Sequence, residues 1–163
     1  MVLEGGLRDR MIHESLGRHI ETDLTTRGWF DAGRDHAPII VITGFPNDTD
    51  EVEINTIAFS VEDATGEDLE MGSLSEVHQT AFFVDMFMED DAVGWHLSGD
   101  VYSFVRKNAA SLDVFDYSQG GDPVDFTVSL IEIQRRKPTR AVNSWQRHWF
   151  TVGLIAEDFR TNV

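Results

Sequence analysis

The sequence predicts an α+β domain in which two helices pack on a mainly antiparallel β-sheet. Two segments carry apolar residues at helical spacing, and the segments that follow each of them alternate apolar and polar residues as strands do. The predicted order is therefore helix, three strands, helix, three strands. No internal repeat and no Pro-, Gly- or Ser-rich linker interrupts the sequence, so we expect residues 1–163 to form a single domain.

The first helix is predicted over residues 7–27, where an apolar residue recurs every four positions and Gly28 supplies a stop. Its apolar stripe consists of Ile12, Leu16, Ile20 and Leu24. The run PIIVITG at residues 38–44 is apolar and β-branched, which favours a strand covered on both faces.

Two further strands are expected before the second helix. Residues 51–61 alternate with a change of phase, which indicates a strand with a bulge or with burial on both sides. Residues 62–72 are polar and rich in turn formers, and we interpret DLEMGS at residues 68–73 as a hairpin corner whose bend Gly72 permits. A long strand follows at residues 73–90, and we expect it to project in a hairpin. One face carries Phe82, Val84, Met86 and Met88, and the other carries Val77, Ala81 and Phe83.

The second helix is predicted to begin after a cap at Asp90 or Asp91 and to end near Lys107. Its apolar stripe comprises Val93, Leu97, Val101, Phe104 and Val105. Trp95 and Tyr102 fall on the far side, roughly 160–200° around the helix from Val93. They are either exposed or, for Trp95, covered by the first helix. Three strands follow, LDVFDYS, PVDFTVSLIEIQR and SWQRHWFTVGLIAED, with a basic loop RRKPTR at residues 135–140 between the last two.

The charges are distributed unevenly. Thirteen Lys and Arg against twenty-nine Asp and Glu give a net charge of −16, and neither Lys nor Arg occurs between Arg34 and Arg106. The sixteen acids from Asp35 to Asp100 supply the whole of that net charge. Such a segment is a solvated acidic face, a surface that repels a polyanion, or one that meets the basic parts of a neighbouring subunit. Tight binding to duplex phosphates is disfavoured, because it needs clustered Lys and Arg.

The residues indicate no catalytic chemistry. There is no Cys, which excludes disulfides, thiolate nucleophiles and Cys-based metal sites. The six His show no zinc-hydrolase spacing, and the acidic stretches DTDEVE and EDATGEDLE depart from the calcium-loop pattern, leaving only a weak surface calcium site open. Phosphate-binding glycine motifs and the GxSxG frame are missing, and a pair such as Glu70 with Asp85 is unspecific among so many acids. We therefore predict no metal site and no catalytic residues.

The sequence also lacks a secretion signal and a run of about 20 apolar residues that would span a membrane. We expect a soluble protein that is made in the cytoplasm.

In its arrangement the sequence resembles the tail terminator proteins of siphophages, in the form found in phages of actinobacteria. The resemblance covers most of the chain: LRDRMIHESLGRHIETDL with Trp29, the strand pair INTIAFSVED and EVHQTAFFVDMFMEDD around DLEMGS, GDVYSFVRK, and SWQRHWFTVGLIAEDF. It implies a subunit of a hexameric ring that caps the tail tube, stops its polymerisation and contacts the head connector, with DNA passing through the lumen. It also implies no enzyme activity and no cofactor. The major tail tube protein and the connector or stopper are then its partners, and its location is the tail–neck junction of the virion.

A ring needs two different patches that meet between neighbours. One hypothesis pairs the acidic middle of the chain with a basic set, with aromatic residues as anchors. These candidate interface residues are Trp95, Tyr102, Arg135, Arg136, Lys137, Arg140 and Arg147. A second hypothesis lines the lumen with carboxylates that repel DNA. Those residues are Asp48, Asp50, Glu51, Glu53, Glu62, Asp63, Glu67, Asp68 and Glu70. The alternatives are another neck protein, such as a head–tail connector or stopper, and more distantly a small acidic hydrolase or ligand-binding domain.

Overall fold

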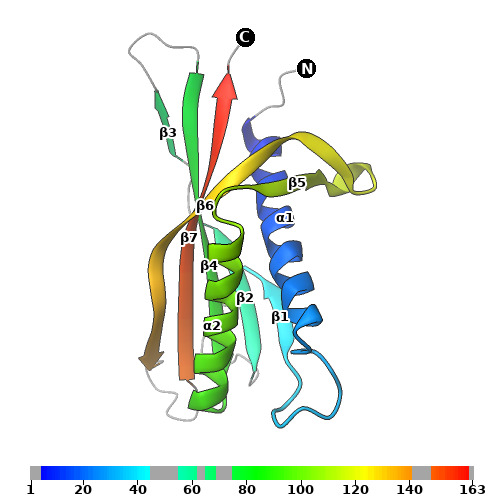
Figure 1. Ribbon diagram of the computed structural model, residues 1–163, viewed down its shortest axis with the longest axis vertical. Coiled ribbons are helices and arrows are strands. Elements are labelled where there is room, and N and C mark those ends of the chain that lie inside the picture. The colour runs from blue at the N-terminus through cyan, green and yellow to red at the C-terminus, as the bar shows by residue number, and fades with distance from the viewer. Residues whose placement is uncertain (1–4, 45–54, 62–64, 69–74, 141–147, 162–163) are drawn as a thin grey trace.

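Seven strands join in one sheet, and two helices accompany it in the computed structural model (Figure 1). The structure describes residues 5–44, 55–61, 65–68, 75–140 and 148–161, with the backbone alone described for residues 5, 6, 65–68, 75, 76, 119, 134–140, 160 and 161. The elements are α1 (Gly5–Thr26), β1 (Ile40–Thr43), β2 (Thr56–Val61), β3 (Thr65–Asp68), β4 (Ser75–Met88), α2 (Asp91–Lys107), β5 (Leu112–Asp116), a 3₁₀ turn η1 (Tyr117–Gln119), β6 (Asp122–Arg140) and β7 (His148–Thr161).

The sheet order is β1-β2-β4-β7-β6-β5, and β3 pairs with β4 outside that path. The pairing of β1 with β2 is parallel, and the other pairings between the described strands are antiparallel. The predicted α+β class and the order of helices and strands are confirmed. β3 is an additional short strand within residues predicted to be a turn-rich connection.

The start of α2 and the end of α1 have local causes that the sequence indicated. The side chain of Asp90 accepts a hydrogen bond from the backbone N–H of Val93 at 3.1 Å, which confirms the predicted N-cap of α2. α1 ends at Thr26, and Gly28 follows with a φ of 79°, a backbone conformation that glycine adopts without steric cost.

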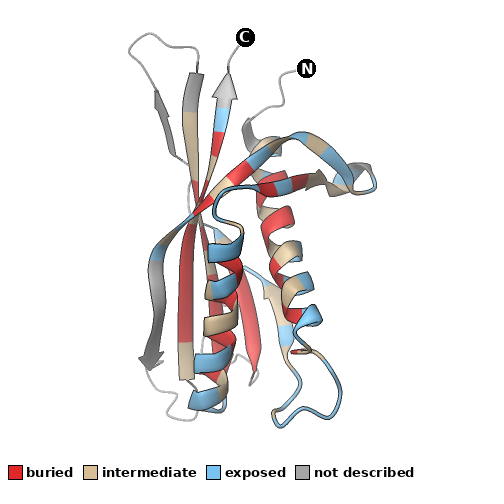
Figure 2. Ribbon diagram, in the orientation of Figure 1, coloured by how far each residue is buried: buried red, intermediate tan, exposed pale blue. Residues whose placement is uncertain are grey.

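The core lies between the two helices and a single face of the sheet (Figure 2). The predicted stripe of α1 is buried in it, together with Leu97, Val101, Phe104 and Val105 of α2. The even-numbered residues of β4 from Phe82 to Met88 and of β7 from Phe150 to Ala156 face these helices. The opposite face of the sheet, formed by the odd-numbered residues of both strands, has no described helix packed on it.

β2 confirms the prediction of burial on both sides. Ile57 and Phe59 belong to the main core, whereas Ala58 packs with Phe87 on the other face. The preceding residue, Asn55, has a φ of 62°, and residues 51–54 lie outside the described part of the chain.

Two strand predictions were wrong in detail. β1 is covered only in part: Ile40 and Thr43 are exposed, whereas Val41 packs on the main core and Ile42 packs on the Ala58–Phe87 cluster of the other face. The basic segment at residues 135–140 is not a loop, because it forms the last part of β6 and pairs with β7, where Lys137 lies opposite Thr151. The register with β7 shifts between Glu132 and Gln134 and again between Gln134 and Lys137, at the start of this segment.

The start of β4, the end of β7 and β3 extend beyond α2 at one end of the molecule, at the top of Figure 1. We call this extension the arm, and it comprises residues 65–68, 75–83 and 153–161. β3 pairs antiparallel with β4, with Asp68 opposite Glu76, as a projecting hairpin requires. Residues 69–74, which include Gly72 and most of the DLEMGS stretch, lie outside the described residues.

Candidate interaction surface

The structure describes only two of the predicted interface side chains, and both lie on α2. Trp95 is 39% exposed and packs edge-on against Phe150 of β7, with ring centroids 5.4 Å apart, so α1 does not cover it. Tyr102 is half-buried, and the guanidinium of Arg106 lies over its ring at 5.8 Å. Both rings are already engaged by residues of their own chain.

Of the charged candidate residues, the structure describes either the backbone alone or nothing. Arg135, Arg136, Lys137 and Arg140 belong to β6, and Glu67 and Asp68 belong to β3, in each case without a described side chain. The others fall outside the described residues: Arg147, Asp48, Asp50, Glu51, Glu53, Glu62, Asp63 and Glu70. The structure therefore leaves both charge hypotheses as predictions.

An apolar surface that the sequence hypotheses did not name runs along the helix-free face of the sheet. Val77 lies opposite Phe159, and Ala81 lies opposite Ile155, which in turn lies opposite Ile131 of β6. Side chains of directly opposed residues share a face. With Phe83 in the next row, these residues form what we call the outer strip: Val77, Ala81, Phe83, Ile131, Ile155 and Phe159. Phe159 is 68% exposed and Ile131 is 44% exposed.

Two described carboxylates lie on the same face of these strands, and each accepts hydrogen bonds from the protein itself. Glu157 accepts one from Gln79 at 2.8 Å. Asp85 is buried and accepts from Trp149 Nε1 at 2.9 Å and Thr151 Oγ1 at 2.7 Å. Burial raises the pKa of Asp85, partly offset by the hydrogen bonds from Thr151 and Trp149. The polar row of Gln79, Glu157 and Ser129 therefore divides the outer strip into two apolar parts, one with Val77 and Phe159 and one with Ala81, Phe83, Ile131 and Ile155.

α1 holds the arm from the other face of the sheet. Arg8 forms an ion pair with the buried Asp158, and it also donates to the carbonyl oxygen of Phe159 at 3.1 Å. Its guanidinium lies 3.6 Å from the ring centroid of Phe126. These contacts fix the strand that presents Phe159, so the exposed phenylalanine stands on a supported element.

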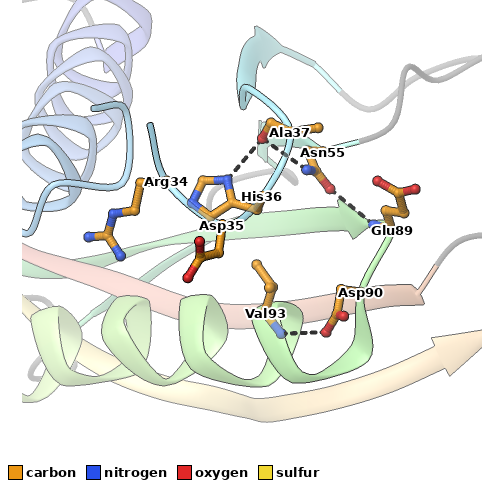
Figure 3. Close-up of a pocket in the computed structure, with 8 residues that line it drawn as sticks. All are labelled: Arg34, Asp35, His36, Ala37, Asn55, Glu89, Asp90 and Val93. Carbon is orange, nitrogen blue, oxygen red and sulfur yellow. Dashed lines mark hydrogen bonds between the residues drawn. The ribbon is translucent and has the colours of Figure 1, made fainter. Parts of the chain in front are cut away.

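A polar pocket of about 400 Å³ lies where α2 begins, beside the segment that leads to β1 (Figure 3). Its polar side chains mostly bind the protein's own backbone. Asn55 donates to the carbonyl of Ala37 at 3.0 Å and accepts from the N–H of Glu89 at 3.0 Å. Arg34 donates to the carbonyls of Gly28 and Arg27, which turns its guanidinium toward the end of α1. The hydrogen bonds of Asn55 hold the chain segment before β1 close to the start of α2.

A second hollow of about 410 Å³ lies between α1 and the β1–β2 edge of the sheet, and we call it the edge groove. Its floor is formed by Val41, Phe59, Val61 and Phe82. On the α1 side it is lined by Gly17, which has no side chain, by His13 and by three charged residues, Glu14, Arg18 and Glu21. Burial lowers the pKa of His13 against the opposing effect of Asp9, so its imidazole is uncharged at neutral pH.

A signal for the outer strip was present in the sequence. Within GLIAEDF, strict alternation places Ile155 and Phe159 on the face opposite Leu154 and Ala156. The edge groove had no such signal, because it forms between elements that are distant in sequence.

Among the described residues, no three His, Asp or Glu side chains are grouped so that they could hold a metal ion. No helix in the described ranges is both long enough and apolar enough to cross a membrane. The sequence matches no protein-family model and no curated protein.

Proposed function

We propose that the chain is a structural protein of a siphophage virion that assembles into a ring at the tail–neck junction. The ring, with six subunits by the resemblance, caps the tail tube, ends its polymerisation and contacts the head connector, while DNA passes through the lumen. A small α+β subunit is what the resemblance implies, and the observed α+β fold supports the proposal.

The observation that carries the proposal is the outer strip. Exposed apolar residues that gather on one face commonly mark a protein–protein contact, whereas isolated exposed ones need no explanation. Here Val77 and Phe159 lie at the end of the arm, and Ala81, Phe83 and Ile155 lie beside Ile131 of β6 beyond the polar row of Gln79 and Glu157. Phe159 is the most exposed of the large apolar side chains described. A subunit that must pack against copies of itself needs such a surface.

The test is assembly on a tail tube. We expect the purified chain to bind the ends of pre-formed tubes, to stop their growth and to show a multiple of the 18.4 kDa subunit mass there. Phe159→Ser should abolish capping, whereas Phe159→Leu, which keeps an apolar side chain, should retain it. Absence of binding to tube ends, with binding to portal-bearing heads instead, would favour the connector or stopper.

The polar pocket is the one feature that favours the ligand-binding alternative. It places Asp35, His36 and Asp90 around a hollow of a size that small ligands occupy. His36 is stacked on Trp29 and bonded to the carbonyl of Ala37, and Asp90 caps α2, so both have structural roles. Binding of a small molecule that Asp35→Asn and His36→Ala both weaken, without loss of stability, would support that alternative over the ring.

A further inference from the structure

We infer that β1 is a docking edge for an extended, basic segment of a partner protein, which adds a strand to the sheet beside the edge groove. In strand addition of this kind, hydrogen bonds between the two main chains provide affinity, and the side chains at alternate positions provide specificity. The edge is separate from the outer strip, so the inference goes beyond the proposed ring and does not depend on it.

The two end strands of the sheet differ in how their edges are occupied. β1 and β5 lie at opposite ends of the strand order. At β5, side chains of α1 bind the backbone: Ser15 Oγ accepts from the N–H of Phe115 at 2.9 Å, and His19 Nε2 donates to the carbonyl of Asp113 at 2.9 Å. Proteins commonly protect sheet edges by covering them. Among the described residues, no side chain binds the backbone of β1 in this way.

The backbone of β1 presents hydrogen-bonding groups on its outer side. In the parallel pairing with β2, the N–H of Ile40 donates to the carbonyl of Asn55 at 2.9 Å, and the N–H of Gly44 donates to that of Phe59 at 2.6 Å. Along a strand, successive residues direct these groups to opposite edges. The N–H and C=O groups of Val41 and Thr43 therefore point away from β2, where a further strand can pair with them.

The edge groove lies on the face of the sheet that such a strand would extend. Val41 and Thr43 line the groove, together with Phe59 and Val61. Residues of an added strand that lie directly opposite Val41 and Thr43 would have their side chains on the same face. Val61 is 41% exposed, so apolar surface is available there for them to cover. The partner segment should therefore carry apolar side chains at alternate positions.

The charges around this edge favour a basic partner over a second copy. β1, β2 and β4 belong to residues 35–100, which contain sixteen acids and no Lys or Arg. In the groove lining, Glu14 pairs with Arg10, and Arg18 lies over an aromatic ring. The carboxylate of Glu21 has no such partner among the described residues. A second copy would bring a further net charge of −16, whereas lysine or arginine side chains would complement the acids.

A synthetic peptide that alternates valine and lysine over about ten residues tests the inference. Two N-methylated forms serve as controls, one methylated at every valine nitrogen and the other at every lysine nitrogen. Because alternate N–H groups point to opposite edges of a strand, only one form loses the donors that face β1. We expect the unmethylated peptide to bind the purified chain in calorimetry, and one methylated form to bind at least about tenfold more weakly than the other.

Three results would overturn the inference. The first is absence of binding by the unmethylated peptide, and the second is equal affinity of the two methylated forms. The third is equal affinity for a peptide in which glutamate replaces every lysine, because the charge of the edge would then play no part.

A variant of the chain removes one outward donor without breaking the pairing of β1 with β2. Thr43→Pro has no N–H at this position, and proline is tolerated in an edge strand when its nitrogen faces away from the sheet. Thr43→Val is the matched control, because it loses the hydroxyl and keeps the N–H. We expect Thr43→Pro to weaken peptide binding about tenfold and Thr43→Val to retain it, with thermal unfolding measured for both. Equal binding by the two variants would place the peptide elsewhere.

Sedimentation of the chain without peptide tests a second copy as the occupant. If Thr43→Pro abolishes a self-association that the parent chain and Thr43→Val both show, β1 binds another copy and the inference of a basic partner is wrong. Peptide binding and tube capping fail independently. A chain that binds the peptide but caps no tubes contradicts only the proposed ring, and a chain that caps tubes without binding the peptide contradicts only this inference.

Discussion

Two glycines on the helices face phenylalanine rings, and the closeness of each ring sets the effect of adding a methyl group. At Gly94 of α2 a Cβ atom would overlap the ring of Phe150, which is itself fully buried. At Gly17 of α1 the nearest ring atom, on Phe59, would lie at an ordinary contact distance of 3.5 Å. Close packing of α2 on β7 therefore depends on Gly94, whereas Gly17 leaves room for a side chain.

We expect Gly94→Ala to lower the free energy of unfolding by about 1–3 kcal/mol or more, because the buried ring of Phe150 has to move. Gly17→Ala should raise it by up to about 1 kcal/mol, because alanine favours a helix interior over glycine. Urea denaturation of both variants measures the difference. Equal effects of the two substitutions would contradict the close approach of α2 to the sheet.

Asp85 should make the folding stability depend on pH in the direction opposite to that of most carboxylates in ion pairs. Burial raises its pKa in the folded state above the ordinary value of 3.8, so the folded chain holds this proton more tightly than the unfolded chain does. The contribution of Asp85 to stability is therefore greatest at low pH and is lost as the pH rises through the raised pKa.

Asp85→Asn should remove this loss, because the amide stays uncharged and keeps an oxygen that accepts from Trp149 and Thr151. The free energy of unfolding of the variant, relative to the parent chain, should increase as the pH rises from about 4. Denaturation at a series of pH values from 4 to 8 measures this difference. Parallel curves for the two chains would show that Asp85 is solvated in the folded state.

At the scale of elements, the arm depends on a charged pair between α1 and β7. Asp158 is 1% exposed, and Arg8, whose side chain is 18% exposed, pairs with it across the front of the sheet. Removing one partner of a buried ion pair leaves an uncompensated charge in the protein, whereas replacing both partners by uncharged groups is often tolerated.

Arg8→Met should therefore destabilise the chain by about 3–5 kcal/mol. The double variant Arg8→Met with Asp158→Asn should recover most of that loss, although Asn restores no ion pair. Thermal unfolding and hydrogen exchange of the amides in β7 measure the two effects. Strictly additive losses in the double variant would show that Arg8 acts through its packing on Phe126 rather than through its charge.

The segments whose strands we did not predict from the sequence are those that become strands only because a neighbouring strand pairs with them. Residues 135–140 are basic and contain Pro138, a composition typical of a loop, yet they form a strand because β7 pairs with them. Among the described strands, β7 is their only neighbour, and such an edge position tolerates proline. Likewise TGED in β3 has a weak strand propensity, and pairing with β4 overrides it.

At the scale of the whole molecule, alternation predicted the faces of β4 correctly but not which face would stay uncovered. Phe82 and Phe83 are both apolar, and only the position of the two helices decides that Phe82 is 2% exposed while Phe83 belongs to the outer strip. The edge groove was likewise beyond prediction, because it joins α1 to strands that begin more than a dozen residues later. Local patterns specify elements, whereas surfaces arise from how the elements pack.

The salt dependence of assembly distinguishes two kinds of contact through which these chains can form a ring. If the acidic middle of one copy meets the basic set of the next, added salt screens the attraction and weakens assembly. If neighbouring copies meet through the apolar residues of the outer strip instead, the main effect of salt is to screen the repulsion between chains that each carry −16.

We expect assembly to strengthen between about 0.01 M and 0.15 M salt, as the Debye length falls from about 30 Å to about 8 Å. Light scattering or sedimentation at several protein concentrations measures the shift, and sodium chloride keeps hydrophobic effects of the salt itself small. Phe159→Leu serves as the matched control, because it keeps the net charge and an apolar side chain and should follow the same salt dependence. Assembly that weakens steadily over this range would assign the subunit contact to the acidic and basic patches, since only an attraction between opposite charges is lost by screening.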